Sequence, residues 1–234
     1  MIKMRKYVLH VGLPKCASTF LRKSIFPRLD DVAVFGDQGI PIKLYNTFYD
    51  DKINLITDEM LCGIPIVPIK STVAKEELFN RLYSLFPHAR IIVVFRDKKS
   101  WLWSAYKHYI QSGGIETFTN FKNKFVCDEV INFDKCEKLL HKTFDEVLVM
   151  KFEDLKNDDH TFVKEICDFI GVAVPDYNST PQNVSMRDNQ IHHYMLYNRL
   201  YKTRYNVNGY LSYRYSPLFW YKRISRLKNL LKKI

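Results

Sequence analysis

The pattern of hydrophobic positions predicts short buried strands that alternate with amphipathic helices. Short runs rich in β-branched, aromatic and other apolar residues predict strands at residues 7–11, 32–35, 53–57, 91–95 and 147–151, and the run at 91–95 is continuous. Apolar residues recur at helical spacing over 73–85, 100–110, 116–124, 133–142, 159–170 and 189–203. This alternation is typical of the α/β class. We therefore expect one domain with a central parallel β-sheet flanked by helices on both faces.

The first strand leads into a loop suited to binding an anion. The strand at 7–11 is broken by Gly-Leu-Pro at 12–14, and a helical pattern starts after Ser18 and Thr19. A strand, tight loop and helix in this order aim backbone N–H groups and the positive end of a helix dipole at one point. Lys15 adds a mobile cation, and the two hydroxyls add donors that also cap the helix.

The loop departs from the Walker A pattern, because no glycine directly precedes Lys15 and no serine or threonine directly follows it. Its order resembles instead the 5′-phosphosulfate loop of sulfotransferases, usually Pro-Lys-Ser/Thr-Gly-Thr/Ser-Thr-x-Leu. The matching residues are Pro14, Lys15, Ser18, Thr19 and Leu21. Cys16 and Ala17 depart from the usual letters, and the change from glycine matters only if residue 17 needs a positive φ. Taken alone, the stretch also fits an ordinary turn with a capping serine.

A second motif follows the central strand. Arg96 comes directly after the run at 91–95, and Ser104 follows eight residues later. Ligands of open α/β sheets bind at the carboxyl ends of strands, so Arg96 and Lys15 are expected to face one crevice. Alone, Arg96 also fits a surface salt bridge and Ser104 a solvated helix position.

This spacing resembles the Arg and Ser of sulfotransferases that hold the 3′-phosphate of the donor nucleotide. Tyr106 matches the aromatic residue that often follows, whereas Lys98 replaces the usual proline. With both motifs in order, the chain is identified as similar to PAPS-dependent sulfotransferases, and it looks like their bacterial carbohydrate-type branch.

The resemblance implies a P-loop-like domain and a donor, 3′-phosphoadenosine 5′-phosphosulfate, whose product is 3′,5′-adenosine bisphosphate. It implies in-line transfer of a sulfuryl group to a hydroxyl or amine of a glycan or glycolipid acceptor, with no metal required. A loop at 181–187 is similar to one that closes over the donor, although a simple capping turn explains it equally well. The implied donor-binding residues are Pro14, Lys15, Cys16, Ala17, Ser18, Thr19, Phe20, Arg96, Ser104, Asn183, Ser185 and Arg187. Lys15 also has a catalytic role in this scheme, because it stabilises the leaving phosphate.

A hydroxyl acceptor needs a general base, and Glu59 is the first candidate. It lies just past the strand at 53–57, and related enzymes that act on sugars often use a glutamate in a comparable place. The same residue also fits a carboxylate that answers a helix dipole. His10 and His108 are weaker candidates, since His10 lies inside a strand and fits a core histidine, and His108 fits a solvated helix position.

The amino-acid composition indicates the cellular compartment in which the protein is expected. The 234 residues are 47% hydrophobic, which suffices for one α/β core. Five scattered cysteines predict neither a disulfide framework nor a zinc site and favour a reducing compartment. The first apolar run is too short for a signal peptide, and no stretch of 18 apolar residues predicts a membrane span. We expect a cytoplasmic protein.

The net charge of +11 is concentrated in the last part of the chain, which has ten Lys and Arg and no Asp or Glu from Asn189 onward. We expect residues 1–188 to form the domain, and residues 189–234 to form a basic helical C-terminal extension packed on or tethered to it. A basic amphipathic helix over 217–233 favours peripheral binding to the inner, anionic face of a membrane, to an anionic glycan, or only to the domain. Nucleic acid is not expected, because no nucleic-acid module accompanies the charge.

Two other function classes stay open from the sequence. One is a small-molecule kinase of the P-loop type, which would bind ATP and magnesium. The other is a basic glycan- or membrane-binding module without catalysis, whose binding would be indifferent to Lys15 and Arg96. The acceptor itself is not predicted, because acceptor pockets are built from variable loops, here at 36–50, 60–72 and 111–130.

Overall fold

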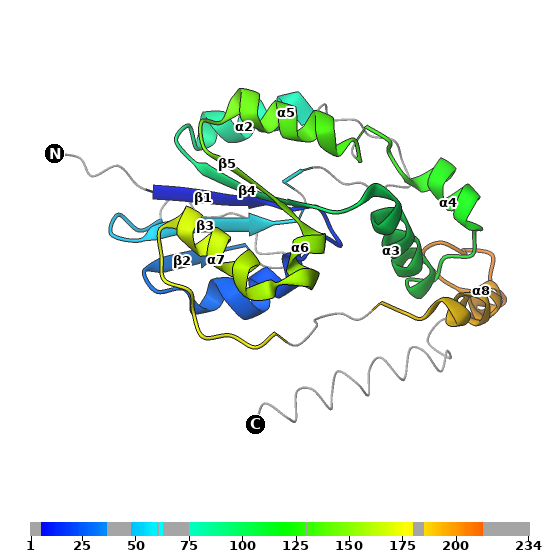
Figure 1. Ribbon diagram of the computed structural model, residues 1–234. Coiled ribbons are helices and arrows are strands. Elements are labelled where there is room, and N and C mark those ends of the chain that lie inside the picture. The colour runs from blue at the N-terminus through cyan, green and yellow to red at the C-terminus, as the bar shows by residue number, and fades with distance from the viewer. Residues whose placement is uncertain are drawn as a thin grey trace. The chain divides into compact units, whose positions relative to one another are not determined.

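Five parallel strands form the sheet that organises the chain, in the order β2-β3-β1-β4-β5. The computed structural model in Figure 1 describes residues 6–36, 48–59, 61–62, 75–129, 131–179 and 185–212. The strands are β1 Lys6–Val11, β2 Val32–Phe35, β3 Ile53–Asp58, β4 Arg90–Phe95 and β5 Val147–Lys151. Each lies within one residue of the bounds expected from the sequence, and all neighbours pair in parallel. The predicted α/β fold with a parallel sheet is confirmed.

Burial explains why the inner strands could be predicted from the sequence. In β4 the five residues Ile91 to Phe95 are buried, because a central parallel strand is covered on both faces. The edge strand β2 is less buried along its length. A strand covered on both sides must be apolar at every position, which gives the continuous run seen in the sequence.

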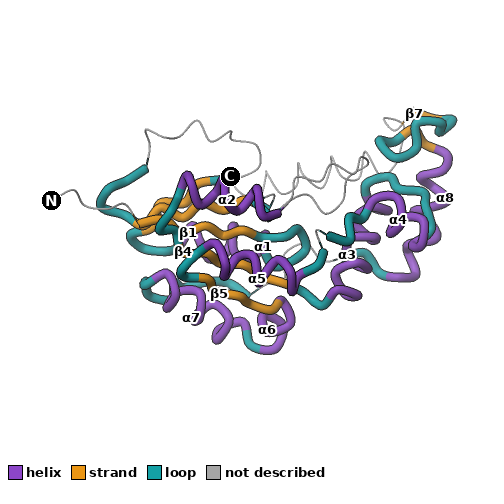
Figure 2. The backbone as a smooth tube through the Cα atoms, turned by 90° about the horizontal axis from the view of Figure 1, so that it is seen from above, coloured by secondary structure: helices purple, strands orange, loops and turns teal. Residues whose placement is uncertain are grey.

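Helices cover both faces of this sheet. Figure 1 shows α2 (Lys75–Leu85) and α5 (Phe133–Thr143) over one face, and the view from above in Figure 2 shows them running along the strands. The other face carries α7 (Asp159–Ile170) and the helical segment after β1. That segment consists of α1 (Ser18–Phe20), the π-helical turn η1 (Leu21–Ile25) and the 3-10 turn η2 (Phe26–Arg28). A short helix that the sequence did not predict, α6 (Phe152–Asn157), follows β5 directly.

The chain divides into two compact units, and the division differs from the expected boundary at 188/189. The first unit comprises residues 1–101 and 124–183, and the second comprises 102–123 and 184–234. Most of α3 (Lys98–Gln111) and of α4 (Phe118–Phe125) therefore groups with the C-terminal part of the chain. The remaining described elements there are η3 (Asp188–Gln190), α8 (Ile191–Leu200), β6 (Tyr201–Lys202) and β7 (Leu211–Ser212).

Side-chain amides explain why the second unit joins distant segments. The buried side chain of Asn198 donates to the carbonyls of Ile110 and Gly114, both at 2.8 Å. Gly114 packs so closely on Tyr109 that an added Cβ would lie 2.2 Å from the ring. A side chain at residue 114 would therefore clash with α3, and one at Gly113 would clash with Thr203.

Some expectations fall on residues outside the described ranges. These are Asn183, the acceptor loop at 60–72 except residues 61–62, most of the loop at 36–50, and the basic helix at 217–233. Within the described ranges, no helix combines the length and the apolar character that crossing a membrane requires.

Candidate anion site at the edge of the sheet

Three neighbouring strands end at the same edge of the sheet and bring the predicted residues together. Val11 at the end of β1 pairs in register with Asp58 at the end of β3, and β4 pairs with the other side of β1. The residues that follow these strands are Gly12, Glu59 and Arg96. The sequence predicted this convergence because the strands were expected to be parallel, and the structure confirms the placement.

The β1–α1 loop, residues 12–18, is held through its backbone carbonyls. The buried indole of Trp101 donates from Nε1 to the carbonyl of Pro14 at 2.8 Å. The guanidinium of Arg96 donates from Nη1 to the carbonyl of Lys15 at 3.2 Å. Ser18 Oγ donates to the carbonyl of Leu13 at 3.3 Å. With these carbonyls occupied by protein donors, the loop has a fixed shape before any ligand arrives.

Left-handed backbone conformations alternate along this loop. Lys15 has φ 71° and Ala17 has φ 62° with ψ −3°. Residues that alternate in this way turn successive N–H groups toward one concavity, which binds anions. Position 17 therefore does need a positive φ, and the alanine found there costs about 1–2 kcal/mol relative to a residue without Cβ. Strain of this kind is typical of functional sites.

Two cations meet at this loop. Burial lowers the pKa of Lys15; the charge of Glu59 opposes this shift, and that of Arg96 adds to it. Burial also lowers the pKa of Arg96. Its guanidinium lies 4.5 Å over the ring of Phe152, and its Nε donates to Ser100 Oγ at 2.8 Å. Two partly desolvated cations so close together would be stabilised by a bound anion.

Within the first unit, the side chain of Arg96 donates to Ser100, a residue that the sequence analysis did not name. Ser100 lies one helical turn after the strand end, and its backbone N–H is capped by Asp97 Oδ1 at 2.8 Å. Ser104 lies half-buried on α3 in the second unit. Sequence reasoning missed Ser100, although its spacing of four residues from Arg96 at a helix start was a readable signal.

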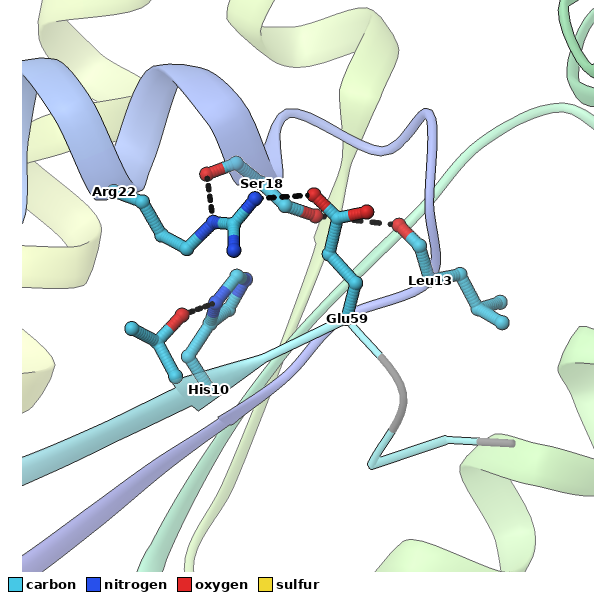
Figure 3. A network of polar contacts seen from close by, with 6 residues as sticks. His10, Leu13, Ser18, Arg22 and Glu59 are labelled. Carbon is cyan, nitrogen blue, oxygen red and sulfur yellow. Dashed lines mark hydrogen bonds and ion pairs between the residues drawn. The ribbon is translucent and has the colours of Figure 1, made fainter. Parts of the chain in front are cut away.

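Glu59 is held by an arginine that the sequence did not single out. In Figure 3, Arg22 Nη2 lies 2.6 Å from Glu59 Oε1, and the same guanidinium donates from Nε to the carbonyl of Ser18 at 3.4 Å. The side chains of Arg22 and Glu59 are 13% and 24% exposed. Arg22 stands one turn after Ser18, so it ties the helix after the β1–α1 loop to the end of β3.

His10 lies beneath this network and is fully buried. Its Nδ1 lies 2.7 Å from Thr57 Oγ1, and its ring packs edge-on against Phe26. Burial, aided by the charge of Arg22, lowers the pKa of His10 to about 3. This setting favours the core interpretation of His10. The other weak candidate, His108, is exposed on α3 in the second unit.

The other predicted donor-binding residues differ in exposure. Cys16 is fully buried, and burial raises the pKa of its thiol. Phe20 is buried and contacts the ring of Tyr177 edge-on. Pro14 and Thr19 are partly exposed. Cys16 and Phe20 therefore support the loop from inside.

The loop predicted to close over the donor is described only in part. Ser185 and Arg187 are exposed and belong to the second unit. The backbone N–H of Arg187 donates to Gln190 Oε1 at 3.0 Å at the start of η3. This contact is the capping turn that the sequence left open as the alternative.

Comparisons with known proteins agree with this architecture. The family model of the sulfotransferase domain matches residues 8–208. A solved structure of a sulfotransferase from Alicyclobacillus acidocaldarius has a TM-score of 0.56 at 14% identity, and the alignment covers 84% of this chain and 93% of that chain. Mouse sulfotransferase SULT7A1 complexed with PAP has a TM-score of 0.47 at 16% identity, covering 82% of this chain and 64% of that chain. No curated protein matches the chain in sequence.

Proposed function

This chain belongs to the sulfotransferase family, and we propose that it transfers a sulfuryl group from 3′-phosphoadenosine 5′-phosphosulfate to a hydroxyl or amine of a carbohydrate. The observation that carries the proposal is the contact of Arg96 Nη1 with the carbonyl of Lys15 at 3.2 Å. It joins the two motifs that contact the two ends of such a donor in the family. A donor with phosphate groups at both its 3′ and 5′ positions needs two cationic sites, and this edge of the sheet supplies both.

The β1–α1 loop is suited to the 5′-phosphosulfate. Its left-handed residues turn N–H groups toward one concavity, and Lys15 is a mobile ammonium on the same loop. Arg96 offers a planar fork of donors that fits phosphate geometry, and this makes it the candidate for the 3′-phosphate. Ser100 Oγ accepts from Arg96 Nε and fixes the orientation of that fork.

The transfer itself is an in-line displacement at sulfur. A bond forms between the acceptor oxygen or nitrogen and sulfur, while the bond between sulfur and the bridging oxygen of the 5′-phosphate breaks. Negative charge accumulates on the leaving phosphate. Lys15 and the loop N–H groups stabilise that charge, and the loss of one such donor typically lowers the rate by about 10²–10³.

Glu59 accepts the proton of the acceptor in this mechanism. Arg22 contacts Oε1 of its carboxylate. Among the described residues, Oε2 has no hydrogen-bond partner, so this oxygen is available for the proton. Since the charge of Glu59 also reaches Lys15, the base lies close to the cation that stabilises the leaving group. The carbohydrate class follows the resemblance to enzymes that use a glutamate in this place.

Ligand-dependent thermal stability tests the donor assignment. Wild type and Arg96→Ala are heated with 3′,5′-adenosine bisphosphate and, separately, with ATP and magnesium. At a ligand concentration of about 100 times Kd we expect roughly 2.7 kcal/mol of added stability with the bisphosphate. Arg96→Ala should lose this gain, because the phosphate loses its fork.

Arg90→Ala is the matched control for this experiment. Arg90 begins β4 at the opposite end from Arg96 and pairs with Glu146 at 2.7 Å. Its variant should keep the full gain with the bisphosphate. A gain with ATP and magnesium instead, or none in wild type, would overturn the proposed donor.

A further inference from the structure

Two cysteines far apart in the sequence lie together inside the first unit. Cys62 follows β3, and Cys136 lies in the first turns of α5. Their sulfur atoms are 4.0 Å apart, and both residues are fully buried. They are 74 positions apart, which is why their scatter along the chain suggested no pairing. Both are free thiols in this structure.

A buried lysine accompanies this pair. Lys75 begins α2 and is only 5% exposed. An ammonium is rarely buried unless it finds a partner, and here it hydrogen-bonds Cys136. The two thiols therefore differ, since a hydrogen bond from Cys62, together with the charge of Lys75, lowers the pKa of Cys136 to about 7. Cys62 is the donor, and its own pKa is raised.

This asymmetry separates the roles of the two sulfurs. The thiolate is the reactive form of cysteine, so Cys136 is the nucleophile and Cys62 the resolving thiol. The other buried cysteine on a helix, Cys167, has the opposite character, because burial raises its pKa to about 11. Two thiols in contact, one of them with a lowered pKa, can exchange into a disulfide once the thiolate has been oxidised.

We propose that Cys62 and Cys136 form a redox-active dithiol, with Lys75 as its activating residue, that hydrogen peroxide converts to a disulfide. The Cys136 thiolate attacks one peroxide oxygen, an S–O bond forms, the O–O bond breaks, and the departing hydroxide takes a proton to become water. Cys62 sulfur then attacks Cys136 sulfur, the S–S bond forms, and the S–O bond breaks. The second hydroxide leaves with the proton of Cys62 as water. Two thiols lose two electrons and two protons, and one peroxide becomes two waters.

The dithiol of Cys62 and Cys136 lies next to the strand that leads into the candidate site. Cys62 Sγ also lies 3.3 Å from the carbonyl of Val11, which precedes the β1–α1 loop, so its single S–H is shared between this carbonyl and Cys136 Sγ. A disulfide sulfur carries no proton, so oxidation removes this contact. The sulfurs must also approach from 4.0 Å to about 2.05 Å. Because Cys62 follows Glu59 by three residues, oxidation shifts the segment that carries the candidate base.

Thiol counting by mass tests the disulfide in the full chain. Reduced protein is treated with hydrogen peroxide at pH 7, and unreacted thiols are alkylated with N-ethylmaleimide. The five cysteines of the reduced chain give five adducts. We expect three adducts after oxidation, a loss of two hydrogens, and a cross-linked peptide that contains Cys62 and Cys136. Cys62→Ser and Cys136→Ser should each abolish the cross-link, and Cys167→Ser should keep it.

The rate tests the role of Lys75. Lys75→Met removes the charge but keeps an unbranched side chain, and Lys75→Arg keeps the charge. Without the ammonium the pKa of Cys136 rises, so a smaller fraction of this residue is thiolate at pH 7, partly offset by the higher nucleophilicity of a more basic thiolate. We expect cross-linking to be at least about twofold slower in Lys75→Met, and near the wild-type rate in Lys75→Arg. Equal rates in all three proteins would remove Lys75 from the proposal.

Other outcomes of the mass experiment would overturn the proposal that Cys62 and Cys136 form a disulfide. Five adducts after complete peroxide treatment, separate addition of oxygen atoms to the two cysteines, or a cross-link between other cysteines would each do so. Titration with 3′,5′-adenosine bisphosphate then tests the coupling to the loop, a step that rests on the proposed function. Reduced protein that binds and oxidised protein that binds at least threefold more weakly would support it, and equal affinity would overturn it. Absence of binding in the reduced form would count against the donor alone.

Discussion

The β1–α1 loop and the turn that carries Glu59 follow neighbouring parallel strands, yet they are fixed in different ways. Trp101, Arg96 and Ser18 each donate to a different carbonyl of the loop. The side chain of Glu59, within the described part of the chain, is held by a single ion pair with Arg22. One region has redundant anchors, and the other has one.

The difference matches the two chemical tasks that we propose for these regions. A site for a leaving phosphate works best when its donors are fixed in advance, so several anchors serve it. A base must bind a proton in the transition state and release it afterwards, so its carboxylate keeps one oxygen open. We therefore expect single substitutions to affect the Glu59 side more strongly than the loop anchors, and the following changes test that order.

Glu59→Gln is expected to have the largest effect. It removes the proton acceptor and keeps the size of the side chain, so kcat should fall by about 10²–10⁴. The stability gain with 3′,5′-adenosine bisphosphate should stay at the wild-type level. Steady-state transfer to an accepted sugar measures the first effect, and thermal shift the second. Glu146→Gln, at the opposite end of the sheet, is the control and should leave turnover unchanged. Normal turnover of Glu59→Gln would remove Glu59 from the mechanism.

Arg22→Met should come next, because it removes the ion pair that places Glu59. A misplaced catalytic group lowers rates by about 10². We expect kcat to fall by this factor while bisphosphate binding changes little. Arg22→Lys keeps the charge and should restore part of the rate, whereas a purely structural role predicts that both variants lose stability and donor binding together.

His10 lies below both regions and makes the fold sensitive to acid. Its pKa is about 3 in the folded chain against an ordinary value of 6.5. Between these values the unfolded chain binds a proton that the folded chain does not, so the unfolding free energy falls as the pH drops from 6.5 toward 3. At pH 5 this loss amounts to about 2 kcal/mol. Urea unfolding at pH 7 and pH 5 measures the change in unfolding free energy for wild type and for His10→Gln. The decrease from pH 7 to pH 5 should be larger in wild type by about 2 kcal/mol. Equal losses in both proteins would contradict the burial argument.

Trp101→Phe should have a smaller effect, because it removes one anchor of several. The variant keeps a buried aromatic ring and loses the N–H that donates to the carbonyl of Pro14. The unsatisfied carbonyl lowers stability by about 1–3 kcal/mol. Because the other loop anchors remain, bisphosphate affinity should fall by less than about tenfold, as isothermal titration would measure. A loss as large as that of Arg96→Ala would show that the anchors are not redundant.

The residues that the sequence predicted share a property. Lys15 and Arg96 follow strands that were predicted from short, mostly apolar runs, and parallel strands bring their ends to one edge. Because β4 is buried on both faces, its continuous apolar run could be predicted as a strand from the sequence. The helix α6, with six residues, and the two-residue strands β6 and β7 were too short to show a periodic pattern.

The contacts that the sequence did not predict depend on side chains that reach across the fold. Arg22 and Glu59 are 37 positions apart, and Cys62 and Cys136 are 74 apart. No local periodicity links such pairs, because strand register and side-chain rotamers decide which of them meet. Ser100 was missed for a different reason, since the family resemblance drew attention to the serine one turn later.

The substitution with the smallest expected effect tests whether backbone strain at residue 17 contributes to the stability of the β1–α1 loop. Ala17 occupies a left-handed conformation that glycine adopts without penalty, so Ala17→Gly relieves about 1–2 kcal/mol in the folded state and gives back about 0.4–1 kcal/mol through the more flexible unfolded chain. We expect a net gain near 1 kcal/mol in urea unfolding. Ala173→Gly is the matched control, because that exposed coil residue has no positive φ and should lose stability instead. If both variants lose stability equally, the strain at residue 17 is already relieved by its surroundings, and the loop would owe its shape to its anchors alone.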